Sequence, residues 1–139
     1  MIAIDAQQLS AIRGEGEAAY PHECCGALLG KIDGDTKRIA AILPIANARE
    51  EEERYHRFTI TPEDMMRAEL EARKMKLDVV GFYHSHPDHP ATPSEYDREH
   101  ALPFYSYVIV AVEKGRSARL TSWELTENRD KFKEETIWQ

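Results

Sequence analysis

A short apolar run, Val79–Tyr83, leads directly into the sequence His84-Ser85-His86-Pro87. An apolar run of this length is typical of a buried strand, and an extended chain points residues two apart toward the same face. The side chains of His84 and His86 are therefore expected to project together. In α/β folds, the residues that follow the C-terminal end of a strand commonly build the functional site. The segment thus predicts both a strand and a cluster of histidines at its end.

A carboxylate follows the two histidines at a distance that a loop can span. Ten residues separate His86 from Asp97. Two imidazoles and one carboxylate are three of the four ligands of a tetrahedral zinc ion, and they leave the fourth position to water, as in catalytic sites. Fe²⁺ and Mn²⁺ also accept this set of donors. The alternative is a surface pair of histidines with an unrelated aspartate.

The segment between the histidines and the aspartate is stiffened by three prolines, Pro87, Pro90 and Pro93. Proline fixes φ and excludes a helix from this segment. Ser94-Glu95-Tyr96-Asp97 then has the pattern of a helix N-terminus, which would present Asp97 from a rigid element. His89 is the rival third ligand, but its place in a proline-rich turn favours exposure to solvent.

Length and charge exclude several classes of function. A chain of 139 residues is expected to form a single domain, 1–139, with a sizeable core. The net charge of −7 argues against binding to nucleic acid or to an anionic membrane surface. The sequence has no apolar run long enough to span a bilayer and no secretory signal, so we expect a cytoplasmic protein. Glu50–Glu53 is expected to be a solvated loop.

Cys24 and Cys25 are adjacent, and the sequence has no other cysteines. Neighbouring residues rarely reach the geometry of a disulfide, and a structural zinc site would need a second cysteine pair. We therefore expect two reduced thiols that pack as small buried groups. A cysteine nucleophile at either position is the alternative.

The hydrophobic pattern of the whole chain predicts two long helices and five strands. One helix is expected between Asp5 and Pro21, and another begins at Thr61-Pro62, where a capping hydroxyl precedes a proline. Strands are expected at 24–30, 39–45, 79–83, 104–112 and 119–125, with a hairpin turn at 33–35 and the strand at 104–112 in the centre of the sheet. Residues 128–139 fit either a short helix or an edge strand. This order indicates an α/β (α+β-like) fold with a mixed sheet packed against helices.

Hydrolysis at a metal centre also needs a group that moves a proton from water to the leaving group. Glu23 is the candidate, because it lies where the first helix meets the first buried strand. A carboxylate in such a neighbourhood can exchange a proton near neutral pH. The helical zinc motif His-Glu-x-x-His is absent, since Gly26 stands where the second histidine after His22-Glu23 would be.

Five residues bring these observations together: Glu23, His84, His86, Ser94 and Asp97. A distant glutamate, then His-x-His, seven residues, serine, two residues and aspartate is the motif of the JAMM (MPN-plus) metallopeptidases, and every spacing is kept here. The segments 20–26 and 81–87 extend the similarity. From the first helix to about Leu125, the chain resembles the small stand-alone prokaryotic members of that family.

The resemblance implies a curved mixed sheet with helices, in an architecture similar to that of cytidine deaminases. It implies that His84, His86 and Asp97 bind one Zn²⁺, with water as the fourth ligand. It also implies that Glu23 is the general acid/base and that Ser94 donates a hydrogen bond to the tetrahedral intermediate. Ser94 fits a helix cap as well, and one hydroxyl is not expected to serve both roles fully.

The family's activity implies a hydrolase, a metallopeptidase or isopeptidase that cleaves the amide bond after the C-terminal glycine of a ubiquitin-like or sulfur-carrier protein. A Gly-Gly tail would dock beside a sheet edge as an added strand. Members that trim polyubiquitin carry insertions near the groove. The loop at 46–58 is the candidate here, so a dedicated polyubiquitin enzyme is not expected.

Three alternatives to this activity remain. The first is a hydrolase that releases cysteine from a sulfur carrier in cysteine synthesis. The second is a non-catalytic scaffold or binding module on the same fold. The third is a nucleobase deaminase, which the absence of a Pro-Cys-x-x-Cys segment disfavours.

Overall fold

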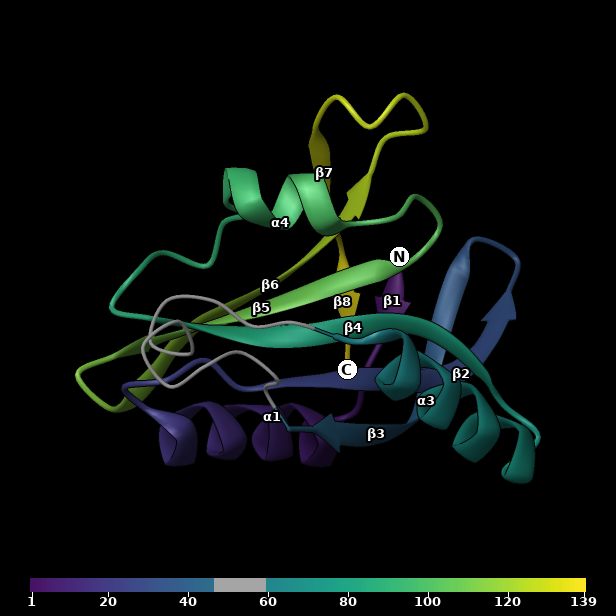
Figure 1. The fold of residues 1–139 in the computed structure, drawn as a ribbon, viewed down its shortest axis with the longest axis horizontal. Coiled ribbons are helices and arrows are strands. Elements are labelled where there is room, and N and C mark those ends of the chain that lie inside the picture. The colour runs from purple at the N-terminus through teal and green to yellow at the C-terminus, as the bar shows by residue number, and fades with distance from the viewer. Residues whose placement is uncertain (47–59) are drawn as a thin grey trace.

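The computed structural model describes residues 1–46 and 60–139 (Figure 1). Within these ranges, an eight-stranded sheet has the order β7-β6-β5-β4-β2-β3-β1-β8. The strands are β1 Ile2–Ala3, β2 Cys25–Asp33, β3 Thr36–Ile45, β4 Asp78–Pro87, β5 Ser106–Glu113, β6 Arg116–Leu125, β7 Phe132–Glu135 and β8 Ile137–Trp138. The helices are α1 Ala6–Ala19, α3 Pro62–Lys74 and α4 Glu95–His100. The expected mixed sheet is confirmed, because β4 pairs in parallel with β5 and antiparallel with β2.

Helices α1 and α3 cover opposite faces of the sheet, because successive strand residues point to opposite sides. The cluster under α1 contains Leu9, Ile12, Leu28, Val80, Tyr83 and Val108. The cluster under α3 contains Ala27, Leu29, Ala68, Ala72, Val79 and Phe82. Helix α4 packs under neither cluster and lies above the strands in Figure 1. The two cores thus hold the central strands rigidly, and α4 stands apart from them.

Both long helices begin where their capping residues predict. Asp5 and Gln8 form a capping box at α1, and Thr61 and Asp64 form one at α3, with Pro62 in the first turn. Helix α1 ends at Ala19, with Tyr20 as its C-cap next to Pro21, as expected.

The sheet is strongly curved. The Lys37 Nζ on β3 donates to the Ser106 Oγ on β5 at 3.0 Å and to the Glu124 Oε2 on β6 at 2.8 Å. Strands β2 and β4 separate β3 from β5 in the sheet order, so only a bent sheet brings these side chains together. The two ends of the chain also meet, because β1 pairs in parallel with β8. The N and C labels in Figure 1 mark this region.

Some expectations need correction. The strand expected at 79–83 continues to Pro87, so the histidines lie within β4 rather than beyond it. Residues 132–135 and 137–138 are strands, so the helix alternative for 128–139 is wrong. Strand β1 has no counterpart among the expected elements. Glu50–Glu53 and nearly all of the 46–58 loop lie outside the described residues. Among the described residues, no helix is long and apolar enough to cross a membrane.

Candidate metal centre

His84 and His86 project from the C-terminal part of β4, which is paired on both sides at His84 and with β5 alone at His86. His84 lies opposite Cys25 of β2 and Ile109 of β5, and His86 lies opposite Ala111 of β5. Both side chains are buried, and their Nε2 atoms are 3.1 Å apart. The expected same-face projection of the two histidines is therefore present.

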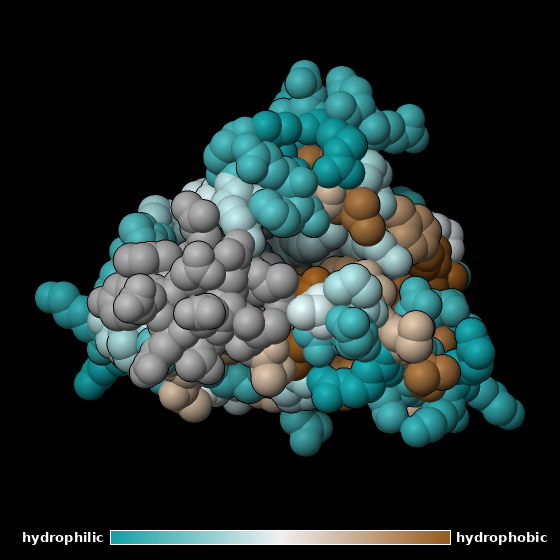
Figure 2. Space-filling model, in the orientation of Figure 1, coloured by the Kyte–Doolittle hydropathy of each residue, from teal (hydrophilic) through white to brown (hydrophobic). Residues whose placement is uncertain are grey.

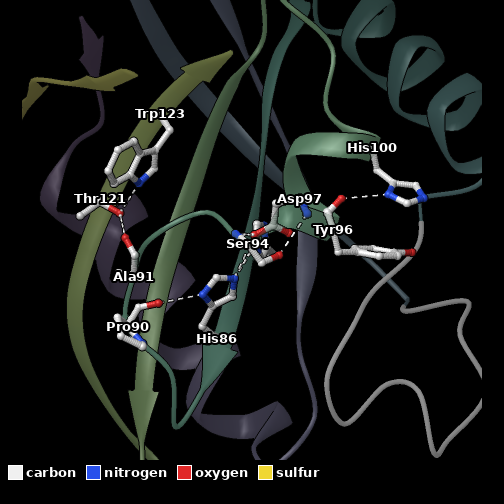
Figure 3. Close-up of polar contacts among 10 residues, drawn as sticks. His86, Pro90, Ala91, Ser94, Tyr96, Asp97, His100, Thr121 and Trp123 are labelled. Carbon is white, nitrogen blue, oxygen red and sulfur yellow. Dashed lines mark hydrogen bonds and ion pairs between the residues drawn. The ribbon is translucent and has the colours of Figure 1, made fainter. Parts of the chain in front are cut away.

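Asp97 reaches the histidines from the first turn of α4 (Figure 3). Its Oδ2 lies 3.2 Å from the His86 Nε2 and 3.4 Å from the His84 Nε2. A capping box fixes this carboxylate: the Ser94 N–H donates to the Asp97 Oδ2 at 2.9 Å, and the Asp97 N–H donates to the Ser94 Oγ at 3.1 Å. The Ser-x-x-Asp spacing thus both caps the helix and aims the aspartate.

These three atoms fit a tetrahedral zinc ion. Bonds of about 2.0–2.1 Å from zinc to nitrogen or oxygen separate the ligand atoms of a tetrahedron by about 3.3–3.4 Å. The observed separations are 3.1, 3.2 and 3.4 Å. One face of the tetrahedron is therefore already formed by protein atoms.

The protonation states of these residues also suit a cation. Burial lowers the pKa of His84, against the opposing charge of Asp97, so its imidazole is neutral near pH 7. Burial alone would raise the pKa of Asp97. The two neighbouring histidine rings and the Ser94 N–H outweigh burial and hold that pKa well below its usual range. A neutral imidazole and an ionised carboxylate are the forms that bind a metal.

A backbone carbonyl sets the tautomer of His86. The His86 Nδ1 lies 2.8 Å from the Pro90 carbonyl oxygen, which can only accept a hydrogen bond. The Nδ1 atom therefore carries the hydrogen, and the Nε2 atom keeps its lone pair toward Asp97 and His84. Such an outer hydrogen bond is the usual partner of a metal-binding histidine.

Glu23 lies beside the same two histidines. Its side chain is buried, at 5% exposure, and one of its carboxylate oxygens lies within 4.8 Å of a ring nitrogen of each histidine. Ser85 holds this segment in place, because the Cys24 N–H donates to the Ser85 Oγ at 2.8 Å and the Ser85 N–H donates to the Cys24 carbonyl at 3.1 Å.

Glu23 and Asp97 therefore compete for the place of third ligand. The Asp97 oxygen lies at tetrahedral separations from both rings, and a Glu23 oxygen lies within 4.8 Å of them. The separations of Asp97 fit a ligand, and the capping box already fixes its carboxylate. His89, the rival from the sequence, is exposed on the loop after β4.

Two hollows meet at the centre. A mainly apolar cavity of about 300 Å³ has His84 and Asp97 in its wall, and its apolar lining residues include Ile60, Met65, Phe82, Leu102, Tyr107 and Phe132. A more polar hollow of about 490 Å³ contains Glu23, His86, Ser94, Glu95 and Asp97. Figure 2 shows hydrophobic surface at the base of the depression between α3 and α4. The metal position thus lies at the junction of an apolar and a polar space.

The cysteines have the character of packing residues. Both are free, and Cys25 is buried. Burial raises the pKa of Cys24 to about 11 and that of Cys25 to about 12. A thiol with such a pKa is protonated at neutral pH, so the nucleophile alternative loses support.

Sequence reasoning missed three parts of the site: the Pro90 carbonyl, the apolar cavity, and a hydrogen-bonded pair, Thr121 and Trp123, that contacts the loop after β4. A backbone carbonyl leaves no mark in the sequence. The cavity combines residues from Ile60 to Phe132, which are far apart along the chain. Only the two-residue spacing of Thr121 and Trp123 was visible, since it places both on one face of a strand.

The buried histidines, the capped aspartate and the adjacent glutamate define a candidate mononuclear metalloprotein. Residues 5–126 match the family described as prokaryotic homologs of the JAB domain, and the chain belongs to that family.

Two curated relatives and one solved structure illustrate the family. The chain is 33% identical to a desampylase of Haloferax volcanii over 98% of this chain and 93% of the relative. It is 32% identical to the Lys-63-specific deubiquitinase BRCC36 of Xenopus laevis over 54% of this chain and 30% of the relative. A JAB1/MPN domain protein from Archaeoglobus fulgidus, 18% identical, shares the fold with a TM-score of 0.58 over 99% of this chain and 98% of that one.

Proposed function

We propose that this chain is a zinc metallopeptidase that cleaves an amide or isopeptide bond after the C-terminal glycine of a ubiquitin-like or sulfur-carrier protein. One observation carries the proposal: the three atoms from His84, His86 and Asp97 lie 3.1–3.4 Å apart, with the Glu23 carboxylate beside them. The similarity to a desampylase and to a deubiquitinase supports a hydrolase that acts on a ubiquitin-like modifier.

His84, His86 and Asp97 would hold the zinc ion. Bound there, zinc supplies Lewis acidity that makes a water molecule nucleophilic near neutral pH and polarises the substrate carbonyl. Glu23 takes the proton of the attacking water and delivers it to the leaving nitrogen. Its burial beside the histidines keeps the carboxylate within reach of both positions.

Ser94 stabilises the oxygen on which negative charge develops. In the capping box its Oγ accepts the Asp97 N–H, which uses a lone pair and leaves the O–H hydrogen for donation. The hydroxyl can therefore cap α4 and donate to the oxyanion at the same time, so the two roles weighed for Ser94 do not exclude each other.

The two hollows give the substrate a direction. The apolar cavity beside His84 and Asp97 suits the tail on the acyl side of the scissile bond, and glycine lets the backbone approach the centre without a side-chain clash. The polar hollow beside Glu23 and Glu95 suits the departing amine, which is cationic once protonated.

The test uses the metal-loaded protein and a ubiquitin-like sulfur carrier fused through its Gly-Gly end to a short peptide. Mass spectrometry should show cleavage after the last glycine, and a chelator should abolish it. Glu23→Gln should abolish cleavage, whereas Glu127→Gln, which removes an exposed carboxylate elsewhere, should not. A carrier with its last glycine changed to leucine should resist.

Cleavage that persists after chelation or in Glu23→Gln would overturn the mechanism. A chain that binds zinc but cleaves none of a panel of Gly-Gly-terminated carriers, linked to peptide, lysine or cysteine, would overturn the proposed substrate class. The relative rates on the three linkages would separate an isopeptidase from a cysteine-releasing hydrolase.

A further inference from the structure

The loop after β4 is fixed to the body of the molecule on both sides of Pro90. Before Pro90, the Asp88 carboxylate accepts hydrogen bonds from the Tyr20 hydroxyl at 2.6 Å and from the Lys114 N–H at 2.8 Å. The Asp88 N–H donates to the Val112 carbonyl at 2.7 Å. These contacts hold the first part of the loop against α1 and β5.

After Pro90, the loop is fixed by two side chains on β6, the buried Thr121 and the partly buried Trp123 (Figure 3). The Thr121 Oγ1 donates to the Ala91 carbonyl at 2.6 Å, and the Trp123 Nε1 donates to the Thr121 Oγ1 at 2.8 Å. Thr121 is 3% exposed and Ala91 is 3% exposed. Because the tryptophan supplies a donor, the threonine hydroxyl is left to direct its own hydrogen at Ala91.

The Ala91 carbonyl, which Thr121 holds, and the Pro90 carbonyl, which contacts His86, belong to neighbouring peptide planes. The Ala91 carbonyl is held by Thr121, and the Pro90 carbonyl accepts from the His86 Nδ1 at 2.8 Å. The two planes are rigid and meet at the Ala91 Cα, so fixing one restricts the orientation of the other. Displacement of Ala91 would therefore turn the Pro90 oxygen away from His86.

We propose that Thr121 and Trp123 are positioning residues of the metal centre. Through the Ala91 and Pro90 carbonyls they hold His86 in the tautomer and orientation that aim its Nε2 at the metal position. They touch neither the metal position nor the substrate. The inference rests on the proposed function only in taking His86 as a zinc ligand.

If Thr121 and Trp123 only stabilised the fold, their substitution would lower stability without a specific effect on zinc binding or on the His86 tautomer. Trp123 also packs against the buried cluster of Ala91, Ile109 and Ala111, so its loss would destabilise the fold in any case. Ser122 provides the matched control on the same strand: it is fully buried, and its Oγ donates to the Glu135 Oε2 at 2.8 Å, away from the loop. Ser122→Ala removes one buried hydrogen bond without touching the chain of contacts to His86.

The experiment compares Thr121→Val, Thr121→Ser, Trp123→Phe and Ser122→Ala. Zinc affinity is measured by competition with a chelator, the His86 tautomer by ¹⁵N NMR of the metal-free protein, and stability by thermal unfolding. Thr121→Val should weaken zinc binding about 10-fold and should populate the other His86 tautomer. Trp123→Phe should act in the same direction, and Thr121→Ser should restore both properties. Ser122→Ala should lower Tm and leave zinc affinity and tautomer unchanged.

The proposal is overturned if Thr121→Val keeps the zinc affinity and the tautomer of the original chain. It is also overturned if Ser122→Ala weakens zinc binding as much as Thr121→Val. If Thr121→Val does not fold, Trp123→Phe decides by the same two readouts. Failure of the unaltered chain to bind zinc would instead contradict the proposed metal centre, and the tautomer measurement would still test the positioning.

Discussion

The two sides of the candidate centre are built in different ways. His84 and His86 belong to a central strand that is paired on both sides and covered by two cores. Asp97 and Ser94 belong to a six-residue helix with no buried residue, which is held by its capping box and by hydrogen bonds to Arg129. We therefore expect the histidine side to be as stable as the whole fold and the aspartate side to depend on a few local contacts. The candidate centre is complete only where α4 brings Asp97 beside the two histidines of β4.

Removing ligands from the two sides should abolish zinc binding in both cases but affect stability differently. His84→Ala and Asp97→Asn should each weaken zinc binding by more than about 100-fold, which exceeds the loss expected when a residue that only supports a ligand is changed. Neither variant should show measurable cleavage. His84→Ala also leaves a cavity in β4, so it should lower the Tm of the metal-free protein more than Asp97→Asn does. Chelator competition and thermal unfolding measure both effects.

Asp97→Asn is the sharper variant, because its amide oxygen can still accept the Ser94 N–H and keep the cap. Tight zinc binding by Asp97→Asn, together with loss of zinc in Glu23→Gln, would show that Glu23 is the third ligand and reverse the assignment of the two carboxylates.

The next effect tests Glu23, which lies beside the two histidines. Glu23→Gln should lower kcat by about 10²–10⁴ while zinc affinity stays close to that of the original chain, because an acid/base group acts on the water and not on the metal. Single-turnover kinetics and metal analysis of the same sample measure the two quantities. A parallel fall in zinc content and kcat would contradict the assigned role.

Ser94 tests whether the aspartate side does more than hold a ligand. Ser94→Ala should lower kcat about 100-fold through loss of the oxyanion donor and destabilise the cap by about 1 kcal/mol. Ser94→Thr keeps a hydroxyl at the cap and should recover most of both. If Ser94→Ala raises the zinc Kd but leaves kcat at saturating zinc unchanged, Ser94 is a cap alone.

The smallest effect is expected at the cysteines on the histidine side. Cys24→Ala/Cys25→Ala should leave kcat/KM unchanged, since both thiols are protonated at neutral pH. Alkylation of the unaltered protein by iodoacetamide should be slow at pH 8 and accelerate only as the pH approaches 11–12, where the thiolates form. Rapid alkylation at pH 8 that stops cleavage would revive the nucleophile alternative.

The elements that local sequence controls could be predicted. Asp5, Thr61 and Ser94 each start a helix, because a side-chain acceptor and the residue three positions later form a capping box. The two-residue spacing of His84 and His86 fixed their common face for the same local reason. The capping pattern also predicted the placement of Asp97, because the side chain at the third helical position points back toward the N-cap residue.

The features that depend on distant parts of the chain could not be predicted. Strand β1 is only two residues long and exists because β3 and β8 flank it. The continuation of β4 through the histidines depends on its parallel partner β5, which follows α4. The support of His86 by Pro90, and of Ala91 by Thr121, uses backbone carbonyls, which every residue has. Tertiary contacts, not local preference, decide these parts of the site.

The most direct test is a crystal structure of the zinc-loaded protein, with anomalous diffraction measured on both sides of the zinc absorption edge. We predict one strong peak within about 2.0–2.2 Å of the His84 Nε2, the His86 Nε2 and an Asp97 carboxylate oxygen. The Glu23 carboxylate should lie outside the coordination shell, facing the open position. No peak at this position, or a peak bound by Glu23 with Asp97 turned away, would contradict the centre described here.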